Sequence, residues 1–418
     1  METNINSEIG KLEGVIIHTP GSEVENMTPE NAERALYSDI LNLSIASKEY
    51  AQLAGVLEKV TTVFKVKDLL TEILSNEQVK FELLKAICVK EGIAGYENEL
   101  MQNTPEQVTN FLVEGVVLEK NNLTNYLSGE RFLMRPLHNL FFTRDSAMGM
   151  NDRMLIGKMA NPVRERESVI MEAIFNAHPG IETTTLNPGA PQNGIIGNAD
   201  STLEGGDFQV AREDIFVIGT GVRTSTHGID FIIENIKQMK TAKHHIIVQE
   251  LPSTPESFIH LDMVFTFLDI DACMVYEPVI YKMNRLRTIH IQIENRKVTR
   301  IEEVPNIPAA LKSLGMDLQP INCGGNNDLW IQEREQWHSG ANFFAFAPGK
   351  IIGYERNSHT IEELNNNGFD VVKANDVIEE KIRLDDYKKC VVQIAGSELA
   401  RGGGGARCMT MPIRRAEV

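Results

Sequence analysis

The sequence predicts an α/β protein that carries an additional helical segment. After about residue 135, short apolar runs typical of β-strands alternate with helical stretches, as in α/β folds. Between about residues 66 and 130 the pattern is helical, with pairs such as Leu69 and Ile73 on one face. At 418 residues the chain is long enough for one large core, or for a core with a smaller domain beside it.

The individual elements follow from local patterns. An apolar run closed by proline predicts a strand at 12–20, and Thr28-Pro29 marks a helix start. Thr104 and Gln107 form the Thr-x-x-Gln pattern of a capping box. Further candidate strands are 214–221, 244–251, 264–269, 272–278, 342–349, 350–355 and 390–396, with helical stretches at 228–240 and 359–367. The sequence at 347–350 predicts a turn between two strands, and no sequence repeat or dividing linker is visible.

Charge and composition narrow the class of partner. A formal net charge of -17 disfavours nucleic acid, because phosphate binding needs clustered lysine and arginine. The charge is compatible with steering of a cationic substrate, although many cytosolic proteins are acidic as well. The sequence shows no secretory signal and no apolar run that spans a bilayer, so we expect a cytoplasmic protein without a membrane partner. Five scattered cysteines without a CxxC motif predict free thiols in a reducing compartment.

Four polar clusters carry the candidate chemistry, namely NLFFTRD (139–145), LEGGDFQV (203–210), HLDMVFTFLD (260–269) and RGGGGARCMTM (401–411). Each has an ordinary structural interpretation, as a local ion pair, a turn, a surface pair or a flexible chain end. If the third cluster is extended, His260 and Asp262 share one face, as an acid/base pair or as two metal ligands. The absence of an HExxH motif and of a second nearby histidine disfavours a metal site.

Together the clusters supply the groups for nucleophilic catalysis by a thiolate. Cys408 follows four glycines, which would let backbone N–H groups approach whatever the thiol contacts. A positioned base activates such a thiolate, and a cation such as Arg407 or the substrate itself lowers the thiol pKa. Several carboxylates facing a thiol match a planar guanidinium. Arg164 and Arg223 are candidates to bind the carboxylate of a free amino acid, or they are ordinary surface arginines.

The motifs FTRD, EGGD, HLD and RCMTMP, in this order, make the sequence resemble the bacterial arginine deiminases. The resemblance includes the segments 7–29 and 333–357, so it runs almost end to end. It implies the pentein fold, a five-fold pseudosymmetric α/β propeller, over residues 1–65 and 135–418, with an inserted α-helical subdomain at 66–134. Members of the family commonly form homo-oligomers.

The resemblance also implies a reaction and a set of catalytic residues. Cys408 would be the nucleophile and His260 the general acid/base, with Glu204 orienting the histidine. Asp145 and Asp262 would grip the guanidinium. L-Arginine would then be hydrolysed to L-citrulline and ammonia through a covalent thiouronium intermediate, without a metal or an organic cofactor.

The substrate-binding residues that the resemblance implies are Asn139, Arg164 and Arg223 at the amino-acid end, Phe142 along the aliphatic stem, Asp207 as a support for a neighbouring loop, and Gly403 in a glycine loop bent over the substrate. Three positions depart from the family. Gly403 stands where many members have arginine, His138 where proline is usual, and Met263 where threonine is usual.

Alternative interpretations remain at this stage. An amidinotransferase or another guanidino-compound hydrolase would use the same cysteine, histidine and acids, and a catalytically silent relative would only bind arginine. Cys323 also precedes glycines and competes with Cys408 as nucleophile, but we interpret it as a structural thiol. Cys88 is expected in a helix core, and Cys273 and Cys390 in strand cores.

Overall fold

The computed structural model describes residues 1–32, 37, 39–190, 195, 197–239, 243–282, 285–326 and 328–418. Within these residues the strands form six sheets, and five sheets contain the same three-strand unit. In each unit two antiparallel strands are followed by a strand parallel to the second. The units are β20 (Met411–Arg415), β1 (Leu12–Ile17) and β2 (Thr62–Lys65); β5 (Ala147–Met150), β6 (Arg153–Ile156) and β7 (Thr184–Leu186); β8 (Phe208–Arg212), β9 (Ile215–Thr220) and β10 (Lys243–Glu250); β11 (Phe265–Asp269), β12 (Ala272–Val275) and β15 (Gln319–Asn322); and β16 (Phe344–Ala347), β17 (Lys350–Tyr354) and β19 (Cys390–Ile394).

The remaining strands extend these sheets or stand apart. The hairpin of β13 (Thr288–Glu294) and β14 (Lys297–Val304) continues the sheet beyond β10. The strand β18 (Asp370–Lys373) pairs with β19. A separate two-stranded sheet joins β3 (Val116–Val117) to β4 (Phe132–Met134).

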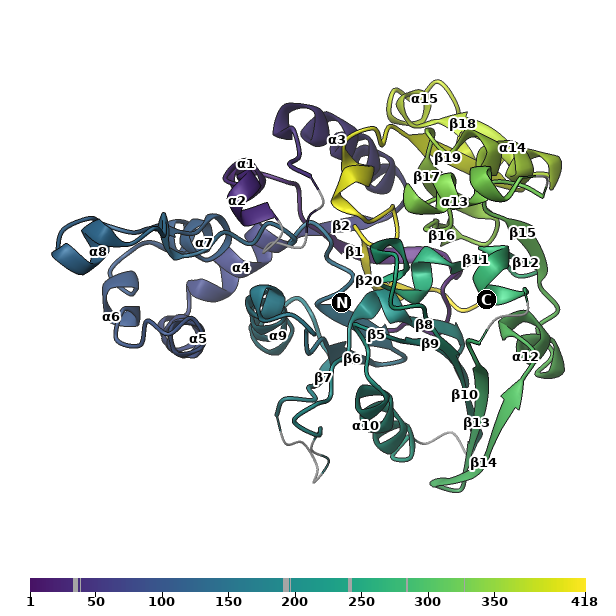
Figure 1. Ribbon diagram of the computed structural model, residues 1–418, viewed down its shortest axis with the longest axis horizontal. Coiled ribbons are helices and arrows are strands. Elements are labelled where there is room, and N and C mark those ends of the chain that lie inside the picture. The colour runs from purple at the N-terminus through teal and green to yellow at the C-terminus, as the bar shows by residue number, and fades with distance from the viewer. Residues whose placement is uncertain are drawn as a thin grey trace.

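Helices surround the strands. Figure 1 shows α3, α9, α10, α12 and α14 around the outside of the sheets, whereas α5, α6 and α8 project to one side. The helices are α1 (Ser22–Glu25), α2 (Pro29–Ala32), α3 (Leu43–Val60), α4 (Val66–Leu74), α5 (Glu77–Lys90), α6 (Glu97–Leu100), α7 (Pro105–Glu114), α8 (Leu123–Leu127), α9 (Glu165–Ala177), α10 (Thr226–Ile236), α11 (Glu277–Ile280), α12 (Ile307–Ser313), α13 (Leu329–Trp337), α14 (Ser358–Asn366) and α15 (Ala374–Ile378). None of the described helices has both the length and the apolar character that crossing a bilayer requires.

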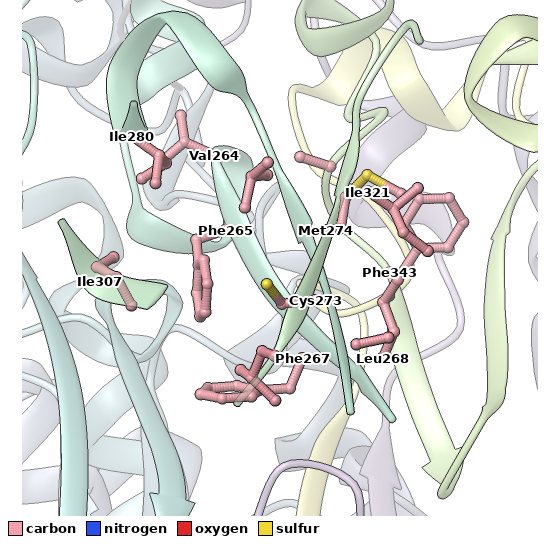
Figure 2. Close-up of a cluster of buried hydrophobic side chains, with 14 of the residues drawn as sticks. Val264, Phe265, Phe267, Leu268, Cys273, Met274, Ile280, Ile307, Ile321 and Phe343 are labelled. Carbon is pink, nitrogen blue, oxygen red and sulfur yellow. The ribbon is translucent and has the colours of Figure 1, made fainter. Parts of the chain in front are cut away.

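Several hydrophobic cores hold the sheets and helices together. Figure 2 shows part of one core, where Cys273 of β12 lies beside Phe265 and Phe267 of β11. The two phenylalanine rings pack edge to face, with their centroids 5.0 Å apart. As predicted, Cys273, Cys88 on α5 and Cys390 on β19 are buried core residues. In a second core the helices α4, α5 and α7 share apolar contacts with α9, β1 and β20. The helical segment therefore packs against the sheets.

Most local predictions are confirmed. Each of the candidate strands coincides with a strand of the structure, and the turn at 347–350 joins β16 to β17. The capping box at Thr104 opens α7. The helix at Thr28-Pro29 is α2, and residues 33–36 after it lie outside the described part of the chain. The extended conformation considered for 260–262 is wrong, since Leu261–Met263 forms one turn of 3-10 helix, η4.

Candidate active site

Cys408 lies in the turn between the 3-10 helix η6 (Leu399–Gly402) and β20, and only 4% of its surface is exposed. Its Sγ lies 3.6 Å from Oδ2 of Asp262 and accepts a hydrogen bond of 3.2 Å from Nδ2 of Asn342. Burial and the negative charges of Asp262 and Asp145 raise the pKa of the Cys408 thiol well above its ordinary value. A backbone hydrogen bond of Gly405 lowers this pKa, in the opposite direction. A cation placed between the two carboxylates would therefore favour the thiolate.

The glycine run before Cys408 is closely packed rather than a slack chain end. A Cβ atom on Gly404 would lie 2.5 Å from the ring of Phe142 and 3.0 Å from Cβ of Cys408. Gly403 has a φ of +83°, in the left-handed region that favours glycine. Tyr354 donates a hydrogen bond of 2.9 Å to the carbonyl of Gly404. The glycines at this point therefore allow close packing against Phe142 and Cys408, and the predicted approach of their backbone to a substrate stays a prediction.

His260 lies between two carboxylates. Its Nε2 is 2.9 Å from Oε2 of Glu204, and its Nδ1 is 3.7 Å from Oδ1 of Asp145. Burial lowers the pKa of His260, but the charge of Asp145 and the hydrogen bond of Glu204 outweigh burial and raise it to about 9. Burial likewise raises the pKa of Glu204, yet the hydrogen bond and charge of His260 bring it to about 2. The pair is thus an imidazolium and a carboxylate at neutral pH.

Asp145 and Asp262 are each held by a buried arginine. Oδ2 of Asp145 accepts from Nη1 of Arg164 at 2.6 Å, and Oδ2 of Asp262 accepts from Nη1 of Arg407 at 2.9 Å. Oδ1 of Asp145 has no hydrogen-bond partner within the described residues. One carboxylate oxygen of Asp145 is therefore fixed, and the other faces His260 with its acceptor capacity unused.

The arginine of each pair is held in turn by a second acid. Arg164 donates from Nε and Nη2 to Glu167, at 3.1 and 2.8 Å. Arg407 forms two hydrogen bonds with Glu8, of 3.0 Å and 3.1 Å. All four side chains are buried. Arg164 and Arg407 therefore each bind two carboxylates of the protein itself.

Arg223 has a different position, on a cavity of about 430 Å³ that opens beside the site. Met263, Arg401 and Gly403 line the same cavity. Nη1 of Arg223 lies 3.8 Å from Oε1 of Glu204, which connects the cavity wall to the buried site. Arg223 is therefore placed to contact a ligand that enters through the cavity.

The other predicted residues lie nearby. Oδ1 of Asp207 accepts a hydrogen bond of 2.9 Å from the backbone N–H of Leu261, and this contact explains why 261–263 turns instead of pairing as a strand. Burial raises the pKa of Asp207 to about 7. Asn139 is buried, and its carbonyl accepts hydrogen bonds from Phe142 and Arg164. The structure thus brings the residues of the first three clusters together.

Comparison with known proteins identifies the family. Residues 33–415 match the arginine deiminase family. The chain belongs to the arginine deiminase family. It is 30% identical over 432 residues to the arginine deiminase of Oenococcus oeni, covering 99% of this chain and 98% of that protein. It is 31% identical over 433 residues to the arginine deiminase of Limosilactobacillus fermentum, covering 99% of each chain.

Solved structures show the same fold at low sequence identity. The product-bound N-terminal domain of ArgZ, an arginine dihydrolase of Cyanobacteria, is 12% identical with a TM-score of 0.53 and covers 96% of this chain and 97% of its own. SxtG, an amidinotransferase from Microseira wollei, is 13% identical with a TM-score of 0.53 and covers 100% of this chain and 98% of its own. This chain therefore has a pentein-type α/β fold.

Sequence analysis of this arginine deiminase family member did not identify three of the buried site residues, namely Glu167, Glu8 and Asn342. Glu167 stands three positions after Arg164, a spacing that brings side chains together on a helix and could have revealed it. Glu8 lies in the opening segment of the chain and carries no local signal. Asn342 is a polar residue at the start of an apolar run that we interpreted only as a strand.

The acids around His260 also resemble a metal-binding group. Asp145, Glu204 and His260 offer ligand atoms that all lie within 4.8 Å of one another. However, both ring nitrogens of His260 face carboxylates, and with a pKa of about 9 the ring is protonated at neutral pH. Nε2 of His260 already contacts Oε2 of Glu204 directly at 2.9 Å, so a metal ion at this nitrogen would have to replace that hydrogen bond. The arrangement therefore suits proton transfer better than metal binding.

Proposed function

We propose that this chain hydrolyses L-arginine to L-citrulline and ammonia, with Cys408 as the nucleophile. The observation that carries the proposal is a buried thiol beside the carboxylate of Asp262, at 3.6 Å, in a site where His260 contacts both Asp145 and Glu204. The names of the family and of the relatives support the same activity.

The two aspartates would bind the substrate guanidinium. A guanidinium presents five N–H donors in a plane, which matches carboxylates on either side of it. Asp145 keeps one oxygen without a hydrogen-bond partner among the described residues, and Asp262 has its Oδ1 3.9 Å from the sulfur of Cys408. The bound cation would offset the two negative charges that raise the pKa of Cys408. Substrate binding would therefore favour loss of the thiol proton to solvent, which leaves Cys408 as the thiolate.

The reaction then proceeds in two displacements. The sulfur of Cys408 forms a bond to the guanidinium carbon, His260 protonates the departing nitrogen, and ammonia leaves as the C–N bond breaks. His260 next takes a proton from water, and the oxygen attacks the carbon of the thiouronium adduct. The C–S bond breaks, its electron pair returns to sulfur, the hydroxyl group on carbon loses its proton to solvent to form the ureido carbonyl, and citrulline is released. Glu204 would keep His260 oriented throughout, and Asp207 would hold the turn that carries it.

Of the two predicted arginines, Arg223 is better placed than Arg164 for the carboxylate end of the substrate, because Arg223 lines the cavity whereas Arg164 is buried against Asp145 and Glu167. The contacts of Arg164 with Asp145 and Glu167 favour a role in holding Asp145, so its binding of the amino-acid end stays a prediction. The roles of Asn139, Phe142 and Gly403 in substrate binding stay predictions as well.

At the level of the fold, we propose that the five three-strand units are arranged as a pseudosymmetric propeller around the site. Residues 1–65 and 135–418 would form the propeller, with 66–134 as an inserted helical subdomain. The shared strand pattern of the five sheets supports this arrangement. The homo-oligomer suggested by the family resemblance stays a prediction too.

The test is ammonia and citrulline formation from L-arginine by the purified protein without an added amine. We expect the two products in equal amounts, and activity lost in Cys408→Ala but retained in Cys323→Ser, whose thiol is buried in another core. Turnover only with an amine acceptor would identify an amidinotransferase instead. A good rate with agmatine, which lacks the carboxylate, would contradict the binding role of Arg223.

A further inference from the structure

Asn342 is a buried residue just before β16, with 1% of its surface exposed. Its Oδ1 accepts hydrogen bonds from the backbone N–H groups of Arg407 and Cys408, at 2.9 and 3.2 Å. Because both partners are donors, they fix which end of the carboxamide is the oxygen. The Nδ2 end therefore faces the site, and it donates to Sγ of Cys408 at 3.2 Å.

The neighbours of Asn342 prevent the carboxamide from turning away. Nδ2 also donates to the carbonyl of Asp262 at 3.2 Å. On the other side, a Cβ atom on Gly405 would lie 2.7 Å from Oδ1 of Asn342. Position 405 therefore needs glycine, because the side chain of Asn342 occupies the space that a Cβ atom would fill. The N–H group is fixed against the sulfur before any substrate binds.

The charges that face the sulfur explain why such a donor matters. Asp262 and Asp145 oppose a negative charge on Cys408, whereas Arg407 favours it. An N–H donor interacts more strongly with an anionic acceptor than with a neutral one. The contact from Asn342 is therefore stronger with the thiolate than with the thiol or with the sulfur of a covalent adduct.

Resting on the proposed role of Cys408 as nucleophile, we propose that the carboxamide of Asn342 is a catalytic group that binds the sulfur in its anionic state. It stabilises the thiolate before attack, and again when the C–S bond breaks and the electron pair returns to sulfur. It transfers no proton, and this task remains with His260.

The test replaces the donor by an acceptor of the same shape, in Asn342→Asp. We expect kcat to fall roughly 10- to 100-fold, and the pH midpoint of Cys408 alkylation by iodoacetamide to rise by roughly one to two units, as the loss of a hydrogen bond to a charged group implies. A lower kcat with an unchanged alkylation midpoint would reveal a merely structural role and overturn the proposal.

A matched control is Asn357→Asp. Asn357 is equally buried, but its Nδ2 donates to the carbonyl of His338 at 3.0 Å. We expect this variant to keep the alkylation midpoint of the wild-type protein. The proposed function itself would be contradicted if the wild-type protein showed no turnover, or if turnover survived in Cys408→Ala. The role of Asn342 alone would be contradicted if turnover depended on Cys408 but the alkylation midpoint did not shift in Asn342→Asp.

A second measurement covers the case in which the aspartate variant does not fold. In wild-type protein with ¹⁵N-labelled asparagine, the side-chain amide signal of Asn342 should shift as the Cys408 thiol titrates. The shift should be absent in Cys408→Ala. A signal that does not respond to the titration in wild-type protein would overturn the proposal.

Discussion

Asp145 and Asp262 each belong to a buried group in which one arginine binds two acids. Arg164 joins Asp145 to Glu167, and Arg407 joins Asp262 to Glu8. Burying a carboxylate is unfavourable unless it is paired and hydrogen-bonded, so each arginine offsets part of the cost of burying the acids that it contacts. The second acid keeps each arginine in place, which fixes the carboxylate beside the thiol.

The same reasoning predicts the effect of removing one charge beside His260. In Glu204→Gln the imidazolium loses its closest carboxylate, so the pKa of His260 should fall from about 9 by roughly one to three units. Because His260 must be protonated to release ammonia, the alkaline limb of kcat should move to lower pH. The measurement is kcat for arginine between pH 6 and pH 10.

The control for this prediction is Glu250→Gln, which removes a carboxylate that pairs with Arg287 at the surface. This variant should keep the wild-type pH profile. An alkaline limb that stays in place in Glu204→Gln would show that His260 is not the group whose protonation limits the reaction.

At the scale of elements, close packing explains why the glycine run at 402–405 needs small residues. Gly402 and Gly404 lie against the ring of Phe142, and the turn that follows presents Cys408. The close approach of backbone to an aromatic ring leaves no space for a side chain. The loop is therefore a rigid support for the thiol rather than a tether.

This packing predicts a large effect for Gly404→Ala. The new Cβ would lie 2.5 Å from Phe142, so the ring or the loop must move. We expect a loss of roughly 1–3 kcal/mol in the free energy of unfolding, together with a lower kcat. Gly129→Ala is the control, because a Cβ there meets no atom within 4 Å. Unfolding in denaturant and steady-state rates measure both effects, and equal behaviour of the two variants would contradict this account of the loop.

The elements themselves were largely predictable from sequence, but their assembly was not. The apolar runs and the capping box at Thr104 are local signals, and the structure contains the corresponding elements. The turn at 261–263 depends on Asp207, more than fifty positions away, so no local pattern reveals it. The repeated three-strand unit likewise escaped the search for sequence repeats, because strand pairing repeats while the residues do not. Position-by-position resemblance supplied most candidate site residues, but it missed Glu167, Glu8 and Asn342.

At the scale of the whole molecule, the two ends of the chain meet beside the site. Strand β1 pairs antiparallel with β20, and Asn4 forms an isolated bridge with Arg414. Glu8 then reaches Arg407, immediately before Cys408. The position of the candidate nucleophile therefore depends on contacts made by the first residues of the chain.

Glu8 should accordingly contribute to stability in a manner that depends on pH. Burial raises the pKa of Glu8, but Arg407 and Arg144 outweigh burial and lower it from 4.5 to about 2. A carboxyl whose pKa is lowered on folding stabilises the protein above its unfolded pKa, and this contribution is lost as the pH falls toward the folded value. Glu8→Gln should therefore reduce the free energy of unfolding at pH 7 by roughly 3 kcal/mol, and the difference from wild type should shrink between pH 4.5 and pH 2. Glu13→Gln on β1, five positions after Glu8, is the control, because its exposed pair with Arg414 should contribute less than about 1 kcal/mol. Denaturant unfolding across this pH range measures both variants, and a difference for Glu8→Gln that does not change with pH would mean that the residue acts through packing instead of charge.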